Sequence, residues 1–487
     1  MTSLRGLVRS LLLTTTGCIA VTSLGHGAQP PDVVVSDSAQ NTAMGTNALL
    51  HLITGPGGGD KNTAAGWSAL FSNTGGSRNS AFGIEALYNN TGYENNAFGE
   101  GALYDNTTGQ QNNAFGVHAL GDNTTGYENS AFGEYALAGN STGEYNSAFG
   151  ASALVNSNGS GNSAFGVSAL ASNGLGLNEN GNYNTAIGYN ALTNNNTGNW
   201  NTAVGVAALN NNDNGNNISG SYNSALGGQA LMHNQVGNEN TALGLNALYS
   251  NTSGNTNTAA GMNALFSNTT GANNTAHGFE SLHANTLGYL NTAVGVAALY
   301  SNTTGSNNIG VGQSAGSKVT TGSNNIHIGA AGSSGDTGTI RIGVQGEQTA
   351  TYIAGISGSP VTGAAVYVTS TGQLGVQASS ERYKTAVASM GSRSEKLGRL
   401  RPVTFRLKTD PKGDVQYGLI AEEVAKVYPE LVIRDSAGKI EGVRYEELAP
   451  MLLNELQQQA AELRDVREEV VELRAALLDL QTSRVRH

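Results

Sequence analysis

A seventeen-residue repeat constrains this chain more than any other feature. Motifs related to Asn-[Thr/Ser]-Ala-x-Gly recur along it, and each continues as Gly-x-x-Ala-Leu before a turn such as Asn-Thr-Thr-Gly. The motif glycines lie at positions 45, 66, 83, 99, 116, 133, 150, 166, 188, 205, 227, 244, 261, 278, 295, 312 and 329, and 11 of the 16 intervals are seventeen residues. Ala-Leu pairs such as Ala136-Leu137 keep a constant phase, so we expect them to face one shared interior.

This pattern predicts a mainly β fold built on a parallel β-solenoid, or β-roll, over residues 45–336. Short extended segments would stack about 4.8 Å apart, and seventeen coils would form a rod of roughly 80 Å. The alternative is a disordered, Asn-rich tract. Biased composition alone would not hold Ala-Leu at one phase over nearly 300 residues, which favours the solenoid. The calcium-binding nonapeptide repeat is absent from the sequence, so we expect no calcium ladder.

Composition and charge exclude several functional classes. Glycine supplies 67 of 487 residues and charged residues only 12%, so a large core of bulky side chains is excluded. From Gly45 to Asp336 there are 14 acidic and 3 basic residues, and from Ser379 to His487 there are 18 of each. No basic stripe is present, which argues against nucleic acid as a partner. The eight histidines lack metal-ligand spacing, so we expect neither a metal nor a cofactor.

The N-terminus predicts export. Arg5 and Arg9 precede an apolar run, and small residues follow up to Ala28, as in a signal peptide over residues 1–28. The run is too short to span a bilayer, which takes about 20 apolar residues, so we expect a secreted or cell-surface protein without an integral membrane segment. Lipidation at Cys18, the only cysteine, is the alternative. It is disfavoured because Thr15 occupies the position where lipoproteins usually carry Leu.

The remaining segments divide by composition. Residues 29–44 are a linker, and alternating β-branched residues over 337–378 predict a short β neck. Charged and helix-forming residues predict a small α+β domain over 379–448 and a trimeric coiled coil over 449–487. The expected heptad seam consists of Leu452, Leu456, Gln459, Leu463, Val466, Val470, Leu473, Leu477 and Leu480. A single amphipathic helix packed on its own domain is the alternative, and the strict two-per-seven seam favours the coiled coil.

Two resemblances add to this interpretation. The repeats resemble the head repeats of trimeric bacterial adhesins, most clearly in "NNIGVGQSAG" and "NNIHIGAAG", which implies a β-roll and a trimer. The segment from 379 to about 455 resembles the intramolecular chaperone, self-processing domain of phage tailspikes such as endosialidases and of the myelin regulatory factor. Four blocks match in order: "SSERYK", "LGRLRPVTFRLK", "YGLIAEEVAKVYPELV" and "YEELAPMLLNELQQQ". The resemblance implies a domain that trimerises, assists folding of the preceding fibre and then cuts itself off.

The second resemblance also implies the site residues. The nucleophile would be Ser379, the base Lys384, and the cleaved bond Ala378–Ser379. Many family members carry Asp after the serine where this chain has Ser380, which bears on the cleavage rate rather than on the fold. A lysine amine can take the hydroxyl proton, and we expect Lys384 near the start of a helix whose positive end would assist. In the alternative, a serine caps the helix and Lys384 is a surface residue.

The order of these parts predicts a function. We expect a secreted or surface-exposed homotrimeric fibre, of adhesin or tail-fibre type, whose C-terminal domain is a candidate serine endopeptidase acting once on its own chain. A surface glycan or a protein receptor would be its partner. One alternative is an uncleaved trimerisation clamp on a structural fibre. Another is a solenoid that orders water or ice, although the position that would need Thr varies, as at Thr202, Ser147 and Asn113.

Overall fold

The computed structural model describes residues 34–53, 57–173, 181–212, 220–354, 365–369, 371–435 and 437–485. The predicted signal peptide, with Cys18, lies outside these residues. The chain divides into two compact units, Met1–Ser357 and Gly358–His487.

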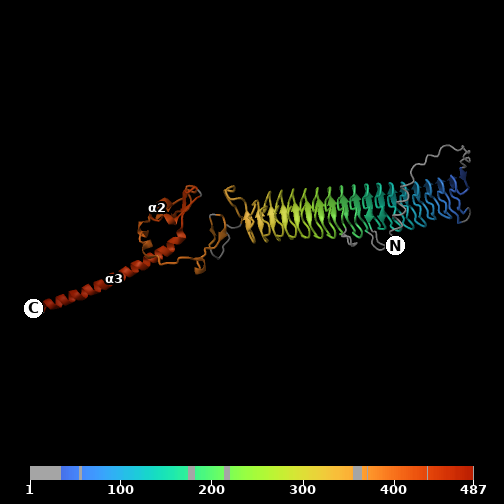
Figure 1. The fold of residues 1–487 in the computed structure, drawn as a ribbon. Coiled ribbons are helices and arrows are strands. Elements are labelled where there is room, and N and C mark those ends of the chain that lie inside the picture. Colours follow the sequence, from blue (N-terminus) through green and yellow to red (C-terminus); the bar gives the residue numbers. More distant parts are fainter. Residues whose placement is uncertain are drawn as a thin grey trace, which may run out of the picture. The chain divides into compact units, whose positions relative to one another are not determined.

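The first unit is the predicted solenoid, and Figure 1 shows its stacked strands from the blue to the yellow part of the chain. Its sheet has 19 strands, all parallel except for the antiparallel pair β1–β2. The strands are β1 Val35–Ser36, β2 Thr42–Met44, β3 Thr63–Ala65, β4 Ser80–Phe82, β5 Asn96–Phe98, β6 Asn113–Phe115, β7 Ser130–Phe132, β8 Ser147–Phe149, β10 Ser163–Phe165, β12 Thr185–Ile187, β13 Thr202–Val204, β14 Ser224–Leu226, β15 Thr241–Leu243, β16 Thr258–Ala260, β17 Thr275–His277, β18 Thr292–Val294, β19 Ile309–Val311, β20 Ile326–Ile328 and β21 Ile340–Ile342. A second pair, β9 Asn156–Ser157 and β11 Ser172–Asn173, is also parallel. The predicted mainly β solenoid is confirmed.

Each coil places small residues inside and larger ones outside. In β7 the middle residue, Ala131, is fully buried and pairs in register with Ala114 and Ala148 of the neighbouring coils. The Ala-Leu pair, for example Ala136-Leu137, is also fully buried, as its constant phase predicted. Because side chains alternate across a strand, the residues on either side of Ala131 face outward.

Glycine is required where the chain bends after each strand. Gly133 has φ +143°, and a Cβ there would lie 2.5 Å from the carbonyl oxygen of Gly150 in the next coil. Both the backbone conformation and the close approach of the next coil therefore exclude other residues. Each coil also holds non-glycine residues with positive φ, including the buried Leu137 at φ 53°. Left-handed backbone costs a leucine about 1 kcal/mol or more, so coil-to-coil packing and hydrogen bonding must offset it.

Two buried asparagine ladders run through the solenoid. The strand-preceding Asn129 is fully buried, donates from Nδ2 to the Gly143 carbonyl at 2.9 Å, and donates from its backbone N–H to Asn112 Oδ1 at 3.0 Å. The turn residue Asn123 donates to the carbonyl of Gly126, three residues on, and to Asn106 Oδ1. The sequence predicts turns at the repeated asparagines, and stacking of the coils also turns these two rows inward, where their side chains are buried.

The second unit is a small α+β region. It contains the hairpins β22 Tyr367–Val368 with β23 Leu374–Gly375, β24 Val403–Phe405 with β25 Gln416–Gly418, and β26 Val432–Arg434 with β27 Ile440–Val443. Its helices are η1 Glu381–Tyr383, η2 Gly391–Ser394, η3 Leu397–Arg399, α2 Ala421–Val427, η4 Pro429–Leu431 and α3 Tyr445–Val485. A core of Val424, Tyr428, Leu431, Val432, Val443 and Met451 joins α2, η4 and the β26–β27 hairpin to the start of α3.

Candidate functional site in the C-terminal unit

The structure places the two predicted dyad residues side by side. Lys384 Nζ donates a hydrogen bond to Ser379 Oγ at 3.3 Å. Ser379 follows β23 by four residues, and the single turn of η1 brings Lys384 back over it. A serine hydroxyl within hydrogen-bond reach of an amine is the arrangement that a serine–lysine nucleophile needs.

The helix at this site differs from the expectation. Lys384 does not lie near the start of a helix: it follows the three-residue η1, in extended backbone, and its N–H donates to the Glu381 carbonyl. Lys384 therefore follows η1 instead of starting a helix, although its amine contacts Ser379, which precedes the η1 N-cap Ser380. Ser380 occupies the N-cap position of η1 but makes no side-chain capping bond. The sequence indicated helical residues here, but the chain continues into extended structure after one turn.

Both dyad side chains are exposed in the single chain. Nucleophilic catalysis by a serine–lysine pair needs a neutral amine, and exclusion of water favours that form. The adjoining Arg382 guanidinium lies 4.7 Å from the centre of the Tyr383 ring, which holds a cation beside the site. The single chain thus supplies the contact between nucleophile and base, and it leaves the site open to solvent.

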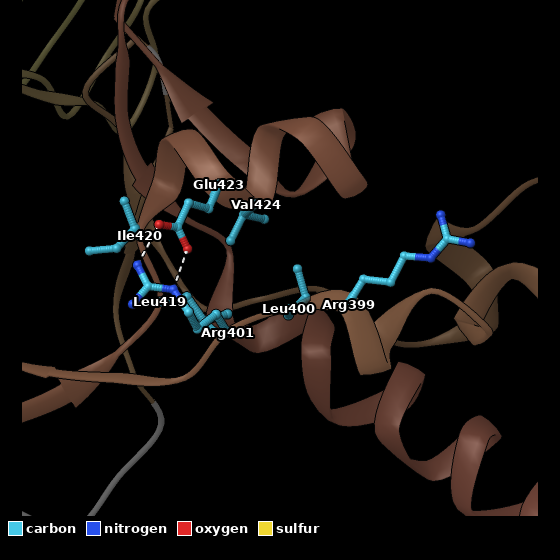
Figure 2. A pocket seen from close by; sticks show the side chains of 7 residues that line it. All are labelled: Arg399, Leu400, Arg401, Leu419, Ile420, Glu423 and Val424. Carbon is cyan, nitrogen blue, oxygen red and sulfur yellow. Dashed lines mark hydrogen bonds and ion pairs between the residues drawn. The ribbon is translucent and has the colours of Figure 1, made fainter.

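A shallow pocket lies elsewhere in the unit, between the η3 end and α2 (Figure 2). Arg401 pairs with Glu423 through two hydrogen bonds, Nε to Oε2 at 3.1 Å and Nη2 to Oε1 at 2.5 Å. This pair lowers the pKa of the Glu423 carboxyl and raises that of Arg401. The other lining residues are Arg399, Leu400, Leu419, Ile420 and Val424. None of the lining side chains is a serine, cysteine or histidine, and the one carboxylate, Glu423, is held by Arg401.

The first turns of α3 are fastened to the unit by polar contacts. The buried Ser394 donates to Glu455 Oε2 at 3.1 Å and accepts from Asn454 Nδ2 at 2.6 Å. Asn454 and Gln458 also donate to the Gly391 carbonyl. After Gln458 the predicted seam residues are open to solvent, with exposed fractions from 40% at Val470 to 64% at Leu480. The predicted helix is present, and the coiled coil stays a prediction.

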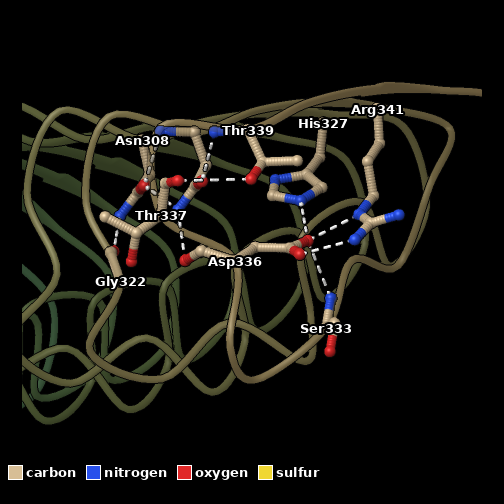
Figure 3. Close-up of polar contacts among 9 residues, drawn as sticks. Asn308, Gly322, His327, Ser333, Asp336, Thr337, Thr339 and Arg341 are labelled. Atoms are coloured by element: carbon tan, nitrogen blue, oxygen red, sulfur yellow. Dashed lines mark hydrogen bonds and ion pairs between the residues drawn. The ribbon is translucent and has the colours of Figure 1, made fainter. Parts of the chain in front are cut away.

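A second cluster of charged side chains closes the C-terminal end of the solenoid (Figure 3). His327 takes the position of the core alanine and is fully buried, and its Nε2 lies 3.0 Å from Asp336 Oδ2. Arg341 donates to both oxygens of Asp336, each at 2.6 Å. These bonds, above all those from Arg341, hold the pKa of the Asp336 carboxyl well below its usual range. The Asp336 carbonyl also accepts from Asn325 and so ends the asparagine ladder.

Neither a metal site nor a membrane span emerges from the described residues. Within them, no group of three or more His, Cys, Asp or Glu side chains could hold a metal ion. No helix in the same residues has the length and apolar character needed to cross a bilayer.

The comparisons with known proteins bear on the C-terminal unit. Residues 379–433 match the model of a peptidase family described as the chaperone of endosialidase. No curated protein and no solved structure matches the chain significantly. The family match begins at Ser379 and ends within β26. The chain is therefore similar to tail-fibre-like proteins in joining a long β-solenoid to a segment of this chaperone family.

Proposed function

We propose that this chain is an exported homotrimeric fibre whose C-terminal unit assists trimer folding and then cuts the bond Ala378–Ser379. The main support is the 3.3 Å hydrogen bond that Lys384 Nζ donates to Ser379 Oγ. Ser379 is also the first residue of the segment that matches the chaperone family. Two residues that the sequence separates by five positions are brought into contact where the family model begins.

The chemistry is an acyl shift followed by hydrolysis. Lys384 takes the hydroxyl proton as Ser379 Oγ attacks the Ala378 carbonyl carbon. The bond from that carbon to the Ser379 nitrogen breaks, an ester to Oγ forms, and the proton passes to the departing amine. Water then hydrolyses the ester, which restores the Ser379 hydroxyl and leaves Ala378 as a new C-terminus. The products are a fibre ending at residue 378 and a fragment of 109 residues (487 − 378).

Trimer formation is supported by the family of the matched segment and by the free part of α3. Most of the stability of protein helices comes from packing of an apolar face, and the apolar seam of α3 after Gln458 is exposed in the single chain. Three such seams packed together would bury it, with Gln459 as a polar layer that sets register. Packing around the dyad in the trimer would also remove water from Ser379 and Lys384.

A chaperone suits a repetitive fibre for a physical reason. Identical coils can pair with the wrong neighbour after a shift of one repeat, and non-local β pairing is slow. A C-terminal trimer would align the three chains in register before the coils form. Removing the module afterwards would leave the fibre kinetically trapped.

Export and partners complete the proposal. The signal peptide over residues 1–28 directs the chain to secretion or to the cell surface. Polar coil surfaces and the acidic balance of the solenoid suit a surface glycan or a protein receptor and repel nucleic acid.

The test compares the wild type with Ser379→Ala, Lys384→Ala and Ser380→Ala by intact mass and native size. We expect a wild-type fragment that starts at Ser379, its absence from the first two variants, and its retention in Ser380→Ala. Ser380→Ala is the matched control because it removes a neighbouring hydroxyl. Cleavage lost only in Ser380→Ala would move the nucleophile by one residue and contradict the assignment to Ser379.

An uncleaved trimer clamp is the second candidate. The exposure of both dyad side chains and Ser380 in place of the family's usual Asp favour it. Intact wild-type chains in stable trimers, under all conditions of expression, would select the clamp over self-cleavage.

A further inference from the structure

Two rows on the outside of the solenoid are rich in large apolar side chains. One row is the last residue of each strand, such as Phe132, and the other is the residue after the corner glycine, such as Val117. From Met44 to Ile328 the first row contains only Met, Ala, Phe, Ile, Val, Leu and one His. We call these two rows, with the glycines between them, the glycine-corner face.

The glycine-corner face is not part of the core. The inward residue of these strands is small, usually alanine, except for His327 in β20, whereas bulkier residues lie outside, half-buried at Phe132 and 57% exposed at Val206. Six phenylalanines from Phe82 to Phe165 stack with ring centroids 4.6–4.9 Å apart. Some twenty such side chains expose on the order of 10³ Å² per chain, which is the size of a stable protein interface and larger than the apolar patches of ordinary monomers.

Charge distinguishes this face from the row of residues that precede the buried asparagines. The first row carries no Asp, Glu, Lys or Arg from Met44 to Ile328, and the second row carries only Glu100 and Glu134. The row before the buried asparagines also has exposed aromatic side chains, but Arg78, Glu94 and other charges interrupt it. Two copies of a solenoid with 14 acidic and 3 basic residues would repel each other over surfaces that carry these charges, and the glycine-corner face carries only two of them, Glu100 and Glu134.

The repeat of the face indicates what covers it. Its side chains recur once per coil along the whole sheet, so an occupant must have the same spacing and length to bury it throughout. A second solenoid of the same chain, parallel and in register, meets this condition. Two narrow apolar rows also resemble the two-row seam of a coiled coil, in which three chains can surround one axis.

We propose that the glycine-corner face is the surface through which three copies of the solenoid pack side by side, in parallel and in register. The glycine line between the rows removes Cβ atoms at the corner and lets neighbouring backbones approach. This inference rests on the homotrimer proposed above and adds the face that the solenoids use.

The test uses single cysteines in the full chain with Cys18→Ser. Val294→Cys and Leu243→Cys lie in the first row, at 38% and 48% exposure. Leu290→Cys and Glu239→Cys, four residues earlier in the same coils, lie before buried asparagines and are the matched controls. Each purified variant is sized by light scattering, oxidised, and run on a non-reducing gel.

We expect trimers in which both first-row cysteines cross-link chains and both control cysteines do not. Trimers in which the control cysteines cross-link and the first-row cysteines react freely with a maleimide would overturn the face and leave the proposed trimer intact. A monomeric wild-type chain would instead refute the trimer itself, and this inference with it.

Discussion

The two units of the molecule bury their apolar side chains in different ways. In the solenoid each coil is buried by the coil before and the coil after, and residues such as Ala131 and Leu137 reach zero exposure within one chain. In the C-terminal unit six side chains form the buried core, and most of α3 is exposed. The difference shows that one chain is enough to bury the interior of the solenoid, whereas a single C-terminal unit leaves most of α3 exposed, as the proposed trimer requires.

The largest effect should come from breaking the seam of α3. Val466→Asp with Leu473→Asp places charges where three helices would meet, and we expect loss of the trimer because buried like charges repel. Arg464→Asp with Ala475→Asp is the control, since these positions lie away from the seam and from the residues that flank it. Native mass reports the outcome. A trimer that persists with both seam charges would show that α3 does not hold the chains together.

A buried ladder residue should show how far the solenoid is self-sufficient. Asn257→Ala removes Oδ1, which accepts hydrogen bonds from the backbone N–H and the Nδ2 of Asn274. It also removes Nδ2, which donates to the Gly271 carbonyl. Leaving these buried groups unpaired should cost about 3 kcal/mol or more. Asn255→Ala, at an exposed position two residues earlier, is the control and should cost far less. Denaturant unfolding, monitored by amide exchange, measures the free energy of unfolding of both variants. Equal losses of stability in the two variants would contradict the role of the ladder.

Acid should open the solenoid at its C-terminal end. Bonds from Arg341 and His327 depress the folded-state pKa of Asp336, so its contribution to stability is present above the unfolded value near 4 and is lost as pH falls below it. Asp336→Asn should remove this pH dependence and cost roughly 2 kcal/mol at neutral pH, since it weakens charge-assisted hydrogen bonds to a carboxylate that is buried while its partner Arg341 is half-exposed. Amide exchange at residues 325–342 between pH 3 and 7 tests this; a pH response that survives in Asp336→Asn would refute it.

The smallest effect should come from removing the exposed ion pair between Arg401 and Glu423 of α2. Arg401→Ala removes both bonds to Glu423, but solvent screens these charges. We expect no resolvable change in the unfolding midpoint or in the yield of cleaved fragment. Loss of cleavage in Arg401→Ala, with folding intact, would instead give this pair a part in the self-processing site.

Ser379 and Lys384 show how much of the site the sequence could predict. Their identities came from the resemblance of four sequence blocks, because a serine and a lysine five residues apart carry little information by themselves. Their contact depends on the single turn of η1, and the expected longer helix did not form there. The pairing of Ser394 with Asn454 and Glu455 had no signal in the sequence, since about 60 residues separate the partners.

By itself the sequence determined the solenoid and its interior. A constant spacing of Ala-Leu and glycine can be satisfied only when successive coils stack in register, so periodicity fixes the fold and the small-residue core. Tertiary structure decided which polar residues turn inward. Asparagine is common in turns and in ladders alike, and only the carbonyls and side chains of adjacent coils place Asn129 inside and leave Phe132 outside. It also decided where the array ends, because His327, Asp336 and Arg341 close the last coil only once the chain has folded back over it.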